Sequence, residues 1–341
     1  MLPGRTQMSQ GLAVLNQKGE MILLNRFLKE LFHLEKTFVI HQHYLYVFRI
    51  QSLQQTIEKV YQDHEFATSF FEWENKYYSV TAHYLDSAWD QLPCVLLLVN
   101  DVTQIKDVEI TKRDFFANAS HELKSPLTSI IGASELITAG FTKTMEDAED
   151  LATRILQEAQ RMNRLVLDML SLSKYENIII HRGTQMVDLV SVVEDVKHRL
   201  IMVAHEKQIS IDTKLASVVL QGDYEHLYEL IQNVVENSIK YGKVGGFVRV
   251  TIEKDQQSAK IEVEDNGIGI PKAEHNRVFE RFYRIDKSRS QKVSGTGLGL
   301  SIVKHIVMLY QGQIHLVSEP NIGTKITIIL QIGRASCRER V

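Results

Sequence analysis

Two long helical stripes in the middle of the chain constrain its fold more than any other feature. Apolar or small residues recur there at steps of three and four, and Gly140 with a polar stretch up to Glu146 separates the two stripes. The first stripe consists of Phe116, Ala119, Leu123, Leu127, Ile130, Ser134 and Ile137, and the second of Leu151, Ile155, Ala159, Met162, Val166, Met169 and Leu172. Two antiparallel helices with one stripe each cannot enclose a core alone. The pattern therefore predicts a homodimer whose paired hairpins form a four-helix bundle.

Strand-like runs lie on both sides of these helices. Within residues 11–103, two apolar runs flank Lys18-Gly19, helical spacing follows, and alternation leads into the buried run "CVLLLVNDVT", which predicts a small α+β domain. Strand-like and helical runs alternate in residues 186–332 and predict an α/β sandwich. The expected organisation is a tail at 1–10, a domain at 11–103, a helical segment at 104–178, a domain at 186–332 and a disordered or added tail at 333–341.

Composition limits the classes of function. The 341 residues are 44% hydrophobic and 24% charged, with a formal net charge of −3, which argues against a nucleic-acid binder. Of the two cysteines, we expect Cys94 to be a buried apolar residue, while Cys337 lies in the tail, so a reducing compartment fits. No run approaches the roughly 18 apolar residues of a membrane helix, so we expect this chain to be soluble and cytoplasmic.

His121 is the first candidate for chemistry. Residues two apart on a helix lie about 200° apart, so His121, two positions from both Ala119 and Leu123, points away from the apolar stripe. Ser125 shares its face, and Glu122 could accept a proton from the imidazole. Taken alone, a surface histidine without function is the better interpretation. Pro126, which costs about 3 kcal/mol inside a helix, weakens that interpretation.

A polar face on a later helix is a second candidate. Asn233, Asn237, Lys240 and Tyr241 fall on one side of the segment "LIQNVVENSIKYG", and their amide, ammonium and phenol groups suit a magnesium triphosphate. The alternative is a solvated helix face.

Two glycine-containing segments follow. In "EDNGIGI", Asp265 ends an alternating strand before Gly267 and Gly269, where a buried carboxylate could accept from the amino group of adenine and reject guanine. In "SGTGLGLSIVKHI", three glycines precede a helix whose N-terminus could bind phosphate. The alternatives are a plain turn after a strand and a chance glycine triplet.

A basic segment with aromatic residues lies between these two motifs. It carries Arg281, Arg284, Lys287, Arg289 and Lys292, and predicts a lid over phosphates, with an ordinary surface loop as the alternative. Gly323 precedes a last strand and fits a hairpin turn or the same site.

With these motifs in this order, the sequence resembles the sensor histidine kinases of two-component systems, most closely the phosphate-regulon sensor kinase type. The matching segments are "FFANASHELKSPLTSI" for the phosphoacceptor box, "NVVENSIKYG" for the asparagine box, "DNGIG" and "GTGLGLSIVK" for the two glycine boxes, and "FERFYR" for the phenylalanine box. The resemblance covers about 105–332 and implies a dimerising two-helix hairpin and an α/β sandwich ATP-binding domain of the Bergerat type. Residues 11–103 resemble a PAS sensor domain more loosely.

The resemblance implies a role for each matching residue. His121 would take the γ-phosphoryl group of ATP and become phosphohistidine, Glu122 would accept its proton, and Asn237 would coordinate Mg²⁺. Ser125 stands where the family usually has threonine or asparagine, the residue tied to dephosphorylation of the partner. The implied ATP-binding set is Asn233, Asn237, Lys240, Tyr241, Asp265, Gly267, Gly269, Arg284, Gly295, Thr296, Gly297, Leu298, Gly299 and Thr324.

The implied partners are a second copy of the chain and the receiver domain of a response regulator, with ATP and Mg²⁺ as cofactors. The family also implies membrane anchoring through segments absent from this chain, at the cytoplasmic face. Two other functions stay open: an ATPase or serine kinase on the same fold, and a PAS-driven scaffold without kinase activity. His41 and His43 could bind haem or a metal, although surface or strand histidines fit better.

Overall fold

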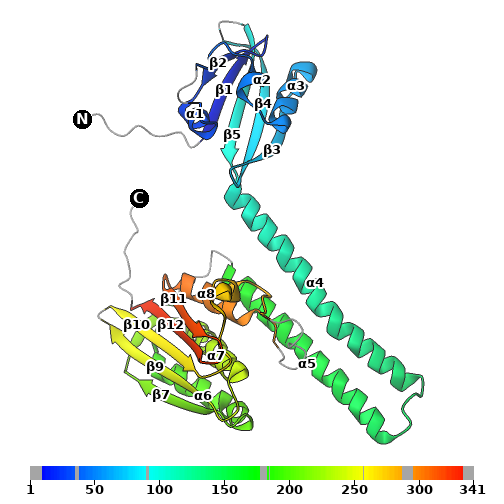
Figure 1. Ribbon diagram of the computed structural model, residues 1–341, viewed down its shortest axis with the longest axis vertical. Helices are drawn as coiled ribbons and strands as arrows, with labels where there is room; N and C mark the ends of the chain where they lie inside the picture. The colour runs from blue at the N-terminus through cyan, green and yellow to red at the C-terminus, as the bar shows by residue number, and fades with distance from the viewer. Residues whose placement is uncertain are drawn as a thin grey trace. The chain divides into compact units, whose positions relative to one another are not determined.

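A computed structural model of the chain describes residues 10–34, 38–89, 92–176, 183, 185–255, 257–285 and 295–332. The chain divides into two compact units, Met1–Asp114 and Phe115–Val341 (Figure 1). Apart from Gln10, both predicted tails, with Cys337 in the second, lie outside the described residues. The lid residues Lys287, Arg289 and Lys292 lie outside them too.

The first unit is built on one antiparallel sheet. Its strands are β1 (Gln10–Asn16), β2 (Met21–Leu24), β3 (Ala67–Trp73), β4 (Lys76–Trp89) and β5 (Leu92–Asp101), in the order β2-β1-β5-β4-β3. Three helices lie between β2 and β3 along the chain: α1 (Arg26–Leu31), α2 (Tyr44–Val47) and α3 (Gln51–Asp63). The predicted hairpin at Lys18-Gly19 is confirmed, because β1 pairs with β2 and Gly19 adopts a φ of 76° that favours glycine.

Two sequence predictions for this unit have a structural outcome. Cys94 is buried, as predicted. His43 caps a helix, since its Nδ1 accepts a hydrogen bond from the backbone N–H of Leu45 at 3.3 Å at the start of α2, and its ring lies against Tyr44. This cap gives His43 a structural role that requires neither haem nor a metal.

The helical hairpin consists of α4 (Thr103–Thr138) and α5 (Met145–Glu176), and α4 crosses the boundary between the two units. The predicted break at Gly140 is confirmed. Pro126 lies inside α4 and is buried, so the apolar burial of its ring offsets part of the cost of a missing helical hydrogen bond.

Within one chain, only part of the predicted stripe of α4 is buried. Ala119, Pro126 and Ala133 are its buried residues, whereas Phe116 and Leu127 are 58% and 46% exposed. At about 100° per residue, steps of seven keep the buried residues on one narrow face, and Phe116 and Leu127 lie roughly 80° away from it. Burial within one chain therefore reaches only one edge of the stripe, and burial of the rest by a second chain stays a prediction.

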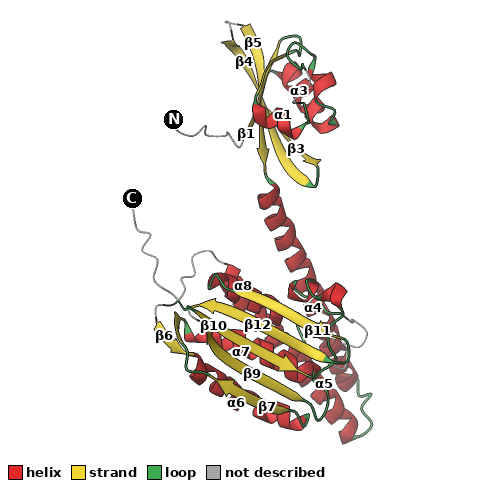
Figure 2. Cartoon of the chain, turned by 60° about the vertical axis from the view of Figure 1, so that its left-hand side comes forward, coloured by secondary structure: helices red, strands yellow, loops and turns green. Residues whose placement is uncertain are grey.

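The second unit also contains an α/β sandwich. Its main sheet has the order β11-β12-β10-β9-β7, antiparallel except for the parallel pair β7 and β9, and β6 and β8 form a separate ribbon. Three helices lie on one face of the main sheet (Figure 2). The elements are β6 (Gln185–Asp188), α6 (Leu189–Glu206), β7 (Ser210–Leu215), β8 (Val219–Gly222), α7 (Tyr224–Tyr241), β9 (Phe247–Asp255), β10 (Ser258–Asp265), α8 (Gly299–Leu309), β11 (Gln313–Glu319) and β12 (Gly323–Gln331), with short 3₁₀ turns at Lys272–Glu274 and Arg277–Phe279.

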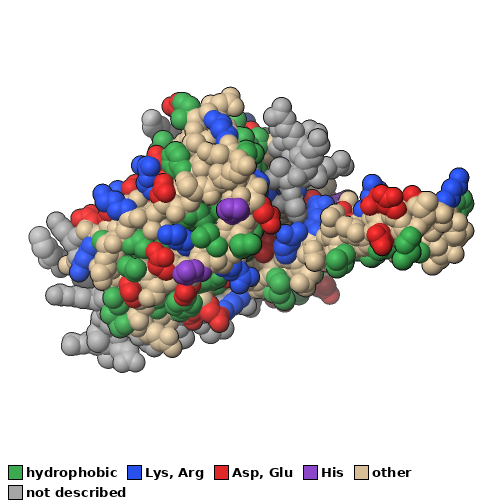
Figure 3. Space-filling view, turned by 90° about the horizontal axis from the view of Figure 1, so that it is seen from below, with side chains coloured by type: hydrophobic (Ala, Val, Ile, Leu, Met, Phe, Trp, Pro, Cys, Tyr) green, Lys and Arg blue, Asp and Glu red, His purple; other side chains and the backbone are tan. Residues whose placement is uncertain are grey.

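The charges on the surface are of both signs, as expected for a chain with a formal net charge of −3. Acidic, basic and apolar side chains are intermixed over the face seen in Figure 3. Among the described residues, no helix combines the length and the hydropathy that crossing a bilayer requires.

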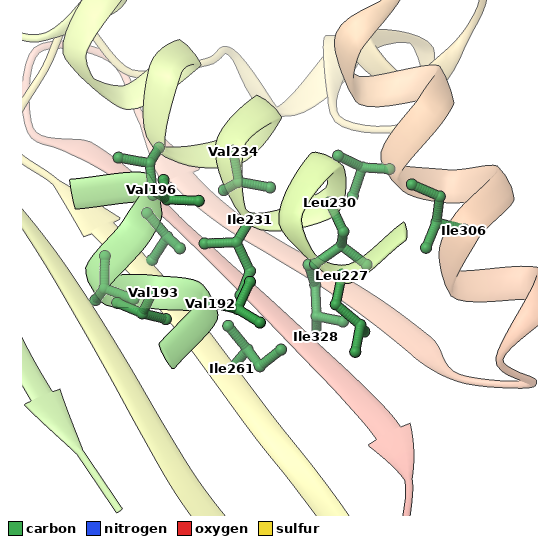
Figure 4. Packing of buried hydrophobic residues seen from close by; sticks show 14 of the residues in the cluster. Val192, Val193, Val196, Leu227, Leu230, Ile231, Val234, Ile261, Ile306 and Ile328 are labelled. Carbon is green, nitrogen blue, oxygen red and sulfur yellow. The ribbon is translucent and has the colours of Figure 1, made fainter. Parts of the chain in front are cut away.

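The sandwich core forms where helices meet the sheet. Strand β10 alternates strictly, with Ala259, Ile261 and Val263 buried, which is typical of a sheet covered on one side. Helix α7 directs Leu230, Ile231 and Val234 towards this face (Figure 4). Since one side of α7 is committed to the core, its polar side is held at a fixed position beside the loops that follow β10 and precede α8.

Candidate functional site

Asp265 marks one end of the candidate site, at the end of β10. It is 8% exposed, and its Oδ1 accepts hydrogen bonds from the backbone N–H groups of Gly267 at 2.9 Å and Thr324 at 3.3 Å. Burial raises the pKa of this carboxyl, while hydrogen bonds from Gly267, Ser238 and Thr324 oppose the rise. A buried, oriented carboxylate of this kind can recognise a hydrogen-bond donor on a ligand.

The glycines around Asp265 are required by close backbone packing. A Cβ added to Gly269 would lie 1.9 Å from the carbonyl oxygen of Glu319, and one added to Gly323 would lie 2.0 Å from the carbonyl oxygen of Asp265. Gly269 also has a φ of 70°, in the left-handed region that favours glycine. Gly323 opens β12 opposite Glu319 of β11, and the next residue, Thr324, pairs with Asp265, so the predicted hairpin turn adjoins the candidate site.

The polar side of α7 faces the loop before α8. The side chains of Asn233 and Asn237 both lie beside Gly299, where an added Cβ would be 2.7 Å from Oδ1 of Asn233 and 3.6 Å from Nδ2 of Asn237. The Nδ2 of Asn233 donates to the carbonyl of Glu229 at 2.9 Å, which fixes the orientation of that amide. The structure therefore brings together two predicted residues that lie far from Gly299 in sequence.

Positive charge gathers one turn further along α7. The Nζ of Lys240 is so close to Gly295 that an added Cβ would lie 1.8 Å from it, and Nη1 of Arg284 donates to the carbonyl of Gly295 at 2.8 Å. Burial, reinforced by the charge of Arg284, lowers the pKa of Lys240 to about 8. Tyr241 is 37% exposed, and burial raises the pKa of its phenol. Burial beside a second cation destabilises the ammonium of Lys240. An anionic ligand between Lys240 and Arg284 would offset this.

The glycine loop leads directly into α8. Gly297 has a φ of 73°, and an added Cβ would lie 2.9 Å from the backbone of Phe282. Leu298 is the N-cap of α8 and its side chain makes no capping hydrogen bond, and helix N-termini that follow such glycine loops can bind phosphates.

The phosphoacceptor candidate lies on α4 in the same unit. His121 and Ser125 are exposed, as predicted from their distance from the stripe. Glu122 is turned towards the second helix, where its Oε2 accepts a hydrogen bond from Nη2 of Arg161 at 3.3 Å. The guanidinium holds the carboxylate of Glu122, the residue next to His121, on the side of α4 that faces α5.

Sequence reasoning missed three residues of this region. Ser238, assigned to the apolar face of α7, is indeed buried, but its side chain bonds to Asp265. Arg161 pairs with Glu122, and Asp168 of α5 contacts the glycine loop through Thr296. A buried serine beside a predicted ligand was a usable signal, whereas the other two depend on contacts between distant segments.

The combination defines a class of protein: a helical hairpin that presents an exposed histidine, joined to an α/β sandwich with a polar anion site. Residues 111–178 match the His Kinase A (phospho-acceptor) domain family, and residues 222–334 match the family of histidine kinase-, DNA gyrase B- and HSP90-like ATPases. These two matches cover more than half of the chain. The chain belongs to the two-component sensor histidine kinases.

Known relatives agree with this assignment. The sensor protein kinase WalK of Staphylococcus aureus (strain Newman) is 30% identical over 328 residues, which cover 95% of this chain and 54% of WalK. A second WalK sequence from Staphylococcus aureus is 29% identical over 328 residues, which cover 95% of this chain and 79% of that protein. The chain thus spans about half the length of the first relative.

Two solved structures share the fold. The histidine kinase AdeS of Acinetobacter baumannii aligns with a TM-score of 0.53 and 24% identity over 63% of this chain and 98% of its own. The histidine kinase ThkA, in a complex with the response regulator protein TrrA, aligns with a TM-score of 0.53 and 18% identity over 95% of this chain and 96% of its own.

The lowered pKa of Lys240 predicts a specific pH dependence of stability. The unfolded chain keeps this proton up to a pKa near 10.5, whereas the folded chain releases it at about 8. Between these values the unfolded state binds more protons, so the free energy of unfolding of the wild type should rise relative to Lys240→Met as pH increases from 8. Below pH 8 the difference should be constant, with the penalty of the buried ammonium fully present.

Urea unfolding of both proteins at pH 7, 8, 9 and 9.5 measures this difference. Lys304→Met removes an exposed lysine on α8 and serves as the control, for which we expect parallel curves. If the free energies of unfolding of the wild type and Lys240→Met differ by the same amount at every pH, the prediction is wrong.

Proposed function

We propose that this chain autophosphorylates on His121 with ATP and passes the phosphoryl group to an aspartate of a response regulator. The observation that carries the proposal is the presence, in one compact unit, of the exposed His121 and of a site with a buried carboxylate at one end and clustered cations at the other. The complex of the relative ThkA with a response regulator supports the partner class.

The proposed nucleotide fits the two ends of the site. Asp265 would accept from the adenine amino group, since its carboxylate is held by Gly267 and Thr324. Lys240, Arg284 and the start of α8 would bind the phosphates. Phosphoryl transfer depends mainly on positioning and charge neutralisation, which these groups supply.

The amides of α7 fit a magnesium ion between the two ends. Asn237 supplies an amide oxygen, a ligand type that Mg²⁺ accepts, and Asn233 lies one turn away with its orientation fixed by Glu229. When bound, the ion would neutralise charge on the phosphates. Asn237 would hold it, and Asn233 would support that position.

The transfer step balances with the residues of α4. An imidazole nitrogen of His121 forms the new bond to phosphorus, the bond between the β- and γ-phosphate groups breaks, and ADP leaves. The proton on the other imidazole nitrogen passes to the carboxylate of Glu122, the next residue in the chain, which in this structure pairs with Arg161. The phosphorylated imidazole is then the donor to the regulator. Dephosphorylation of the regulator through Ser125 stays a prediction from the sequence.

The first unit supports a PAS-like input domain. Its five antiparallel strands in the order β2-β1-β5-β4-β3, with three helices between β2 and β3, agree with the looser resemblance of residues 11–103. The domain limits given above and membrane anchoring through other segments stay predictions.

The phosphorylation assay separates this proposal from its alternatives. With γ-labelled ATP and Mg²⁺, we expect acid-labile, base-stable label in the wild type and in His198→Ala, a control at another exposed histidine, and none in His121→Ala. Label that survives in His121→Ala would exclude phosphorylation of this histidine. Nucleotide binding without label would instead favour a scaffold or an ATPase.

The buried carboxylate predicts base selectivity. Asp265→Asn replaces an acceptor-only group by an amide that can also donate to guanine, so the preference for ATP over GTP should fall at least about tenfold. Displacement of a fluorescent nucleotide by ATP or GTP measures the ratio. Glu264→Gln changes the adjacent carboxylate, which pairs with Arg249 outside the core, and should leave the ratio unchanged. Equal ratios in Asp265→Asn and the wild type would remove Asp265 from base recognition.

The hairpin supports the proposed homodimer. Phe116, Leu127 and Ile131 are exposed and fall within a sector of about 60° on α4, next to the buried face. Helix α5 also exposes a set of apolar residues: Leu156, Val166, Leu167 and Leu170. Two helices that each keep a second apolar face suit a four-helix bundle formed by two chains.

A charge on this face should dissociate the dimer. Ile131→Asp places a carboxylate in the proposed interface, whereas Ser129→Asp adds the same charge on the opposite side of α4. Sedimentation velocity at micromolar concentration should show a monomer for Ile131→Asp and a dimer for the wild type and Ser129→Asp. A dimeric Ile131→Asp variant would place the interface elsewhere.

A further inference from the structure

A carboxylate of the hairpin contacts the glycine loop of the candidate nucleotide site. Asp168 lies on α5, and its Oδ2 accepts a hydrogen bond from Oγ1 of Thr296 at 2.6 Å. Thr296 stands between Gly295 and Gly297, immediately before α8. A carboxylate of the helical hairpin therefore contacts this loop directly.

Asp168 lies among groups of both charges, beside the cations of the expected phosphate site. Lys240 and Arg164 exert attractive fields at this position, and Glu229 and Glu236 oppose them. Burial raises the pKa of the Asp168 carboxyl, and the hydrogen bond from Thr296 lowers it. The carboxylate thus shares with the expected phosphates both the ammonium of Lys240 and the loop beside it.

Other contacts hold α5 against the sandwich and keep Asp168 in place. The hydroxyl of Tyr175 donates to Glu229 at 2.6 Å, and Lys174 pairs with Glu225 at 3.6 Å. Leu165 and Leu172 of α5 belong to the same buried cluster as the residues of α7 and α8, and α5 lies beside α8 (Figure 1). A surface groove beside this contact is lined from both α5 and α7, with Asp168 and Asn233 in its walls.

The docked loop is displaced along the hairpin from His121. The ion pair between Glu122 and Arg161 shows which levels of α4 and α5 face each other. Asp168 is seven positions beyond Arg161, about 10 Å along the helix. A second contact agrees with this level, because the rings of Phe115 and Phe282 lie 5.5 Å apart. The loop is therefore held about one and a half to two turns away from the level of His121.

We propose that Asp168 occupies the glycine loop in place of a nucleotide phosphate, so that docking of α5 on this loop and binding of Mg-ATP oppose each other. This inference rests on the proposed ATP-binding function. A triphosphate beside Lys240 would meet the negative charge of Asp168 at short range, and Thr296 could not donate to both groups. Binding of the nucleotide then releases the loop from α5, which is also what a move towards the level of His121 requires.

The antagonism is reciprocal. A contact that weakens nucleotide binding is itself weakened by the nucleotide to the same extent. Any signal that shifts α5 relative to the sandwich would therefore change the affinity for ATP. The affinity for ATP and the position of the glycine loop relative to His121 would then both depend on the carboxylate of Asp168.

Two substitutions separate the charge from the hydrogen bond. Asp168→Asn keeps an acceptor for Thr296 and removes the charge, and Asp168→Ala removes both. Asp150→Asn makes the same charge change at an exposed position on α5, 18 positions away, and is the matched control. The dissociation constant of the full chain for a fluorescent ATP analogue with Mg²⁺ is measured for each variant, and thermal unfolding confirms that each is folded.

We expect roughly tenfold tighter binding for Asp168→Asn, at least as much for Asp168→Ala, and no change for Asp150→Asn, because a charge at short range in a partly buried site acts strongly. If Asp168→Ala does not fold, the near-isosteric Asp168→Asn decides alone. Unchanged or weaker binding in Asp168→Asn overturns the inference, and so does equal tightening in Asp150→Asn. Absence of nucleotide binding in every protein, including the wild type, overturns the proposed function and the inference with it.

Discussion

The packing of α7 against the sheet is the interaction on which the rest of the site depends. Ile231, Val234 and Val235 are almost fully buried on that side, so the helix cannot rotate without exposing them. The opposite side must then present Asn233 and Asn237 to the glycine loop. Apolar burial, worth about 1.5–3 kcal/mol for each large side chain, thus positions polar groups that contribute little to stability themselves.

Stability and function make opposite demands at the anion end of the site. The ammonium of Lys240 lies partly buried beside Arg284. Both burial and the second cation disfavour its charged form, so the pKa of the lysine is lowered. The hairpin provides one compensating charge through Asp168, and a nucleotide would provide several. The same cations can therefore stabilise either the contact with α5 or the bound phosphates, and this choice links the conformation of the hairpin to the nucleotide.

Much of the fold could be predicted from local patterns. The helical hairpin with its break at Gly140, the first β-hairpin and the alternating strand β10 all follow from periodicities that a few neighbouring residues establish. The stripe of α4 has the predicted spacing, but Phe116 and Leu127 stay exposed within one chain. Steps of three and four describe a broad face, and which part of it is buried within one chain depends on where α5 packs.

The sequence by itself determined which residues could do chemistry: an exposed histidine next to a carboxylate, a polar helix face and glycines at defined steps. It determined these because exposure on a helix and freedom at a glycine are local properties. The tertiary structure alone decided that Glu122 meets Arg161, that Ser238 bonds to Asp265 and that Asp168 reaches Thr296. These pairs join segments up to 128 positions apart, and their proximity depends on how whole helices dock, which no local pattern encodes.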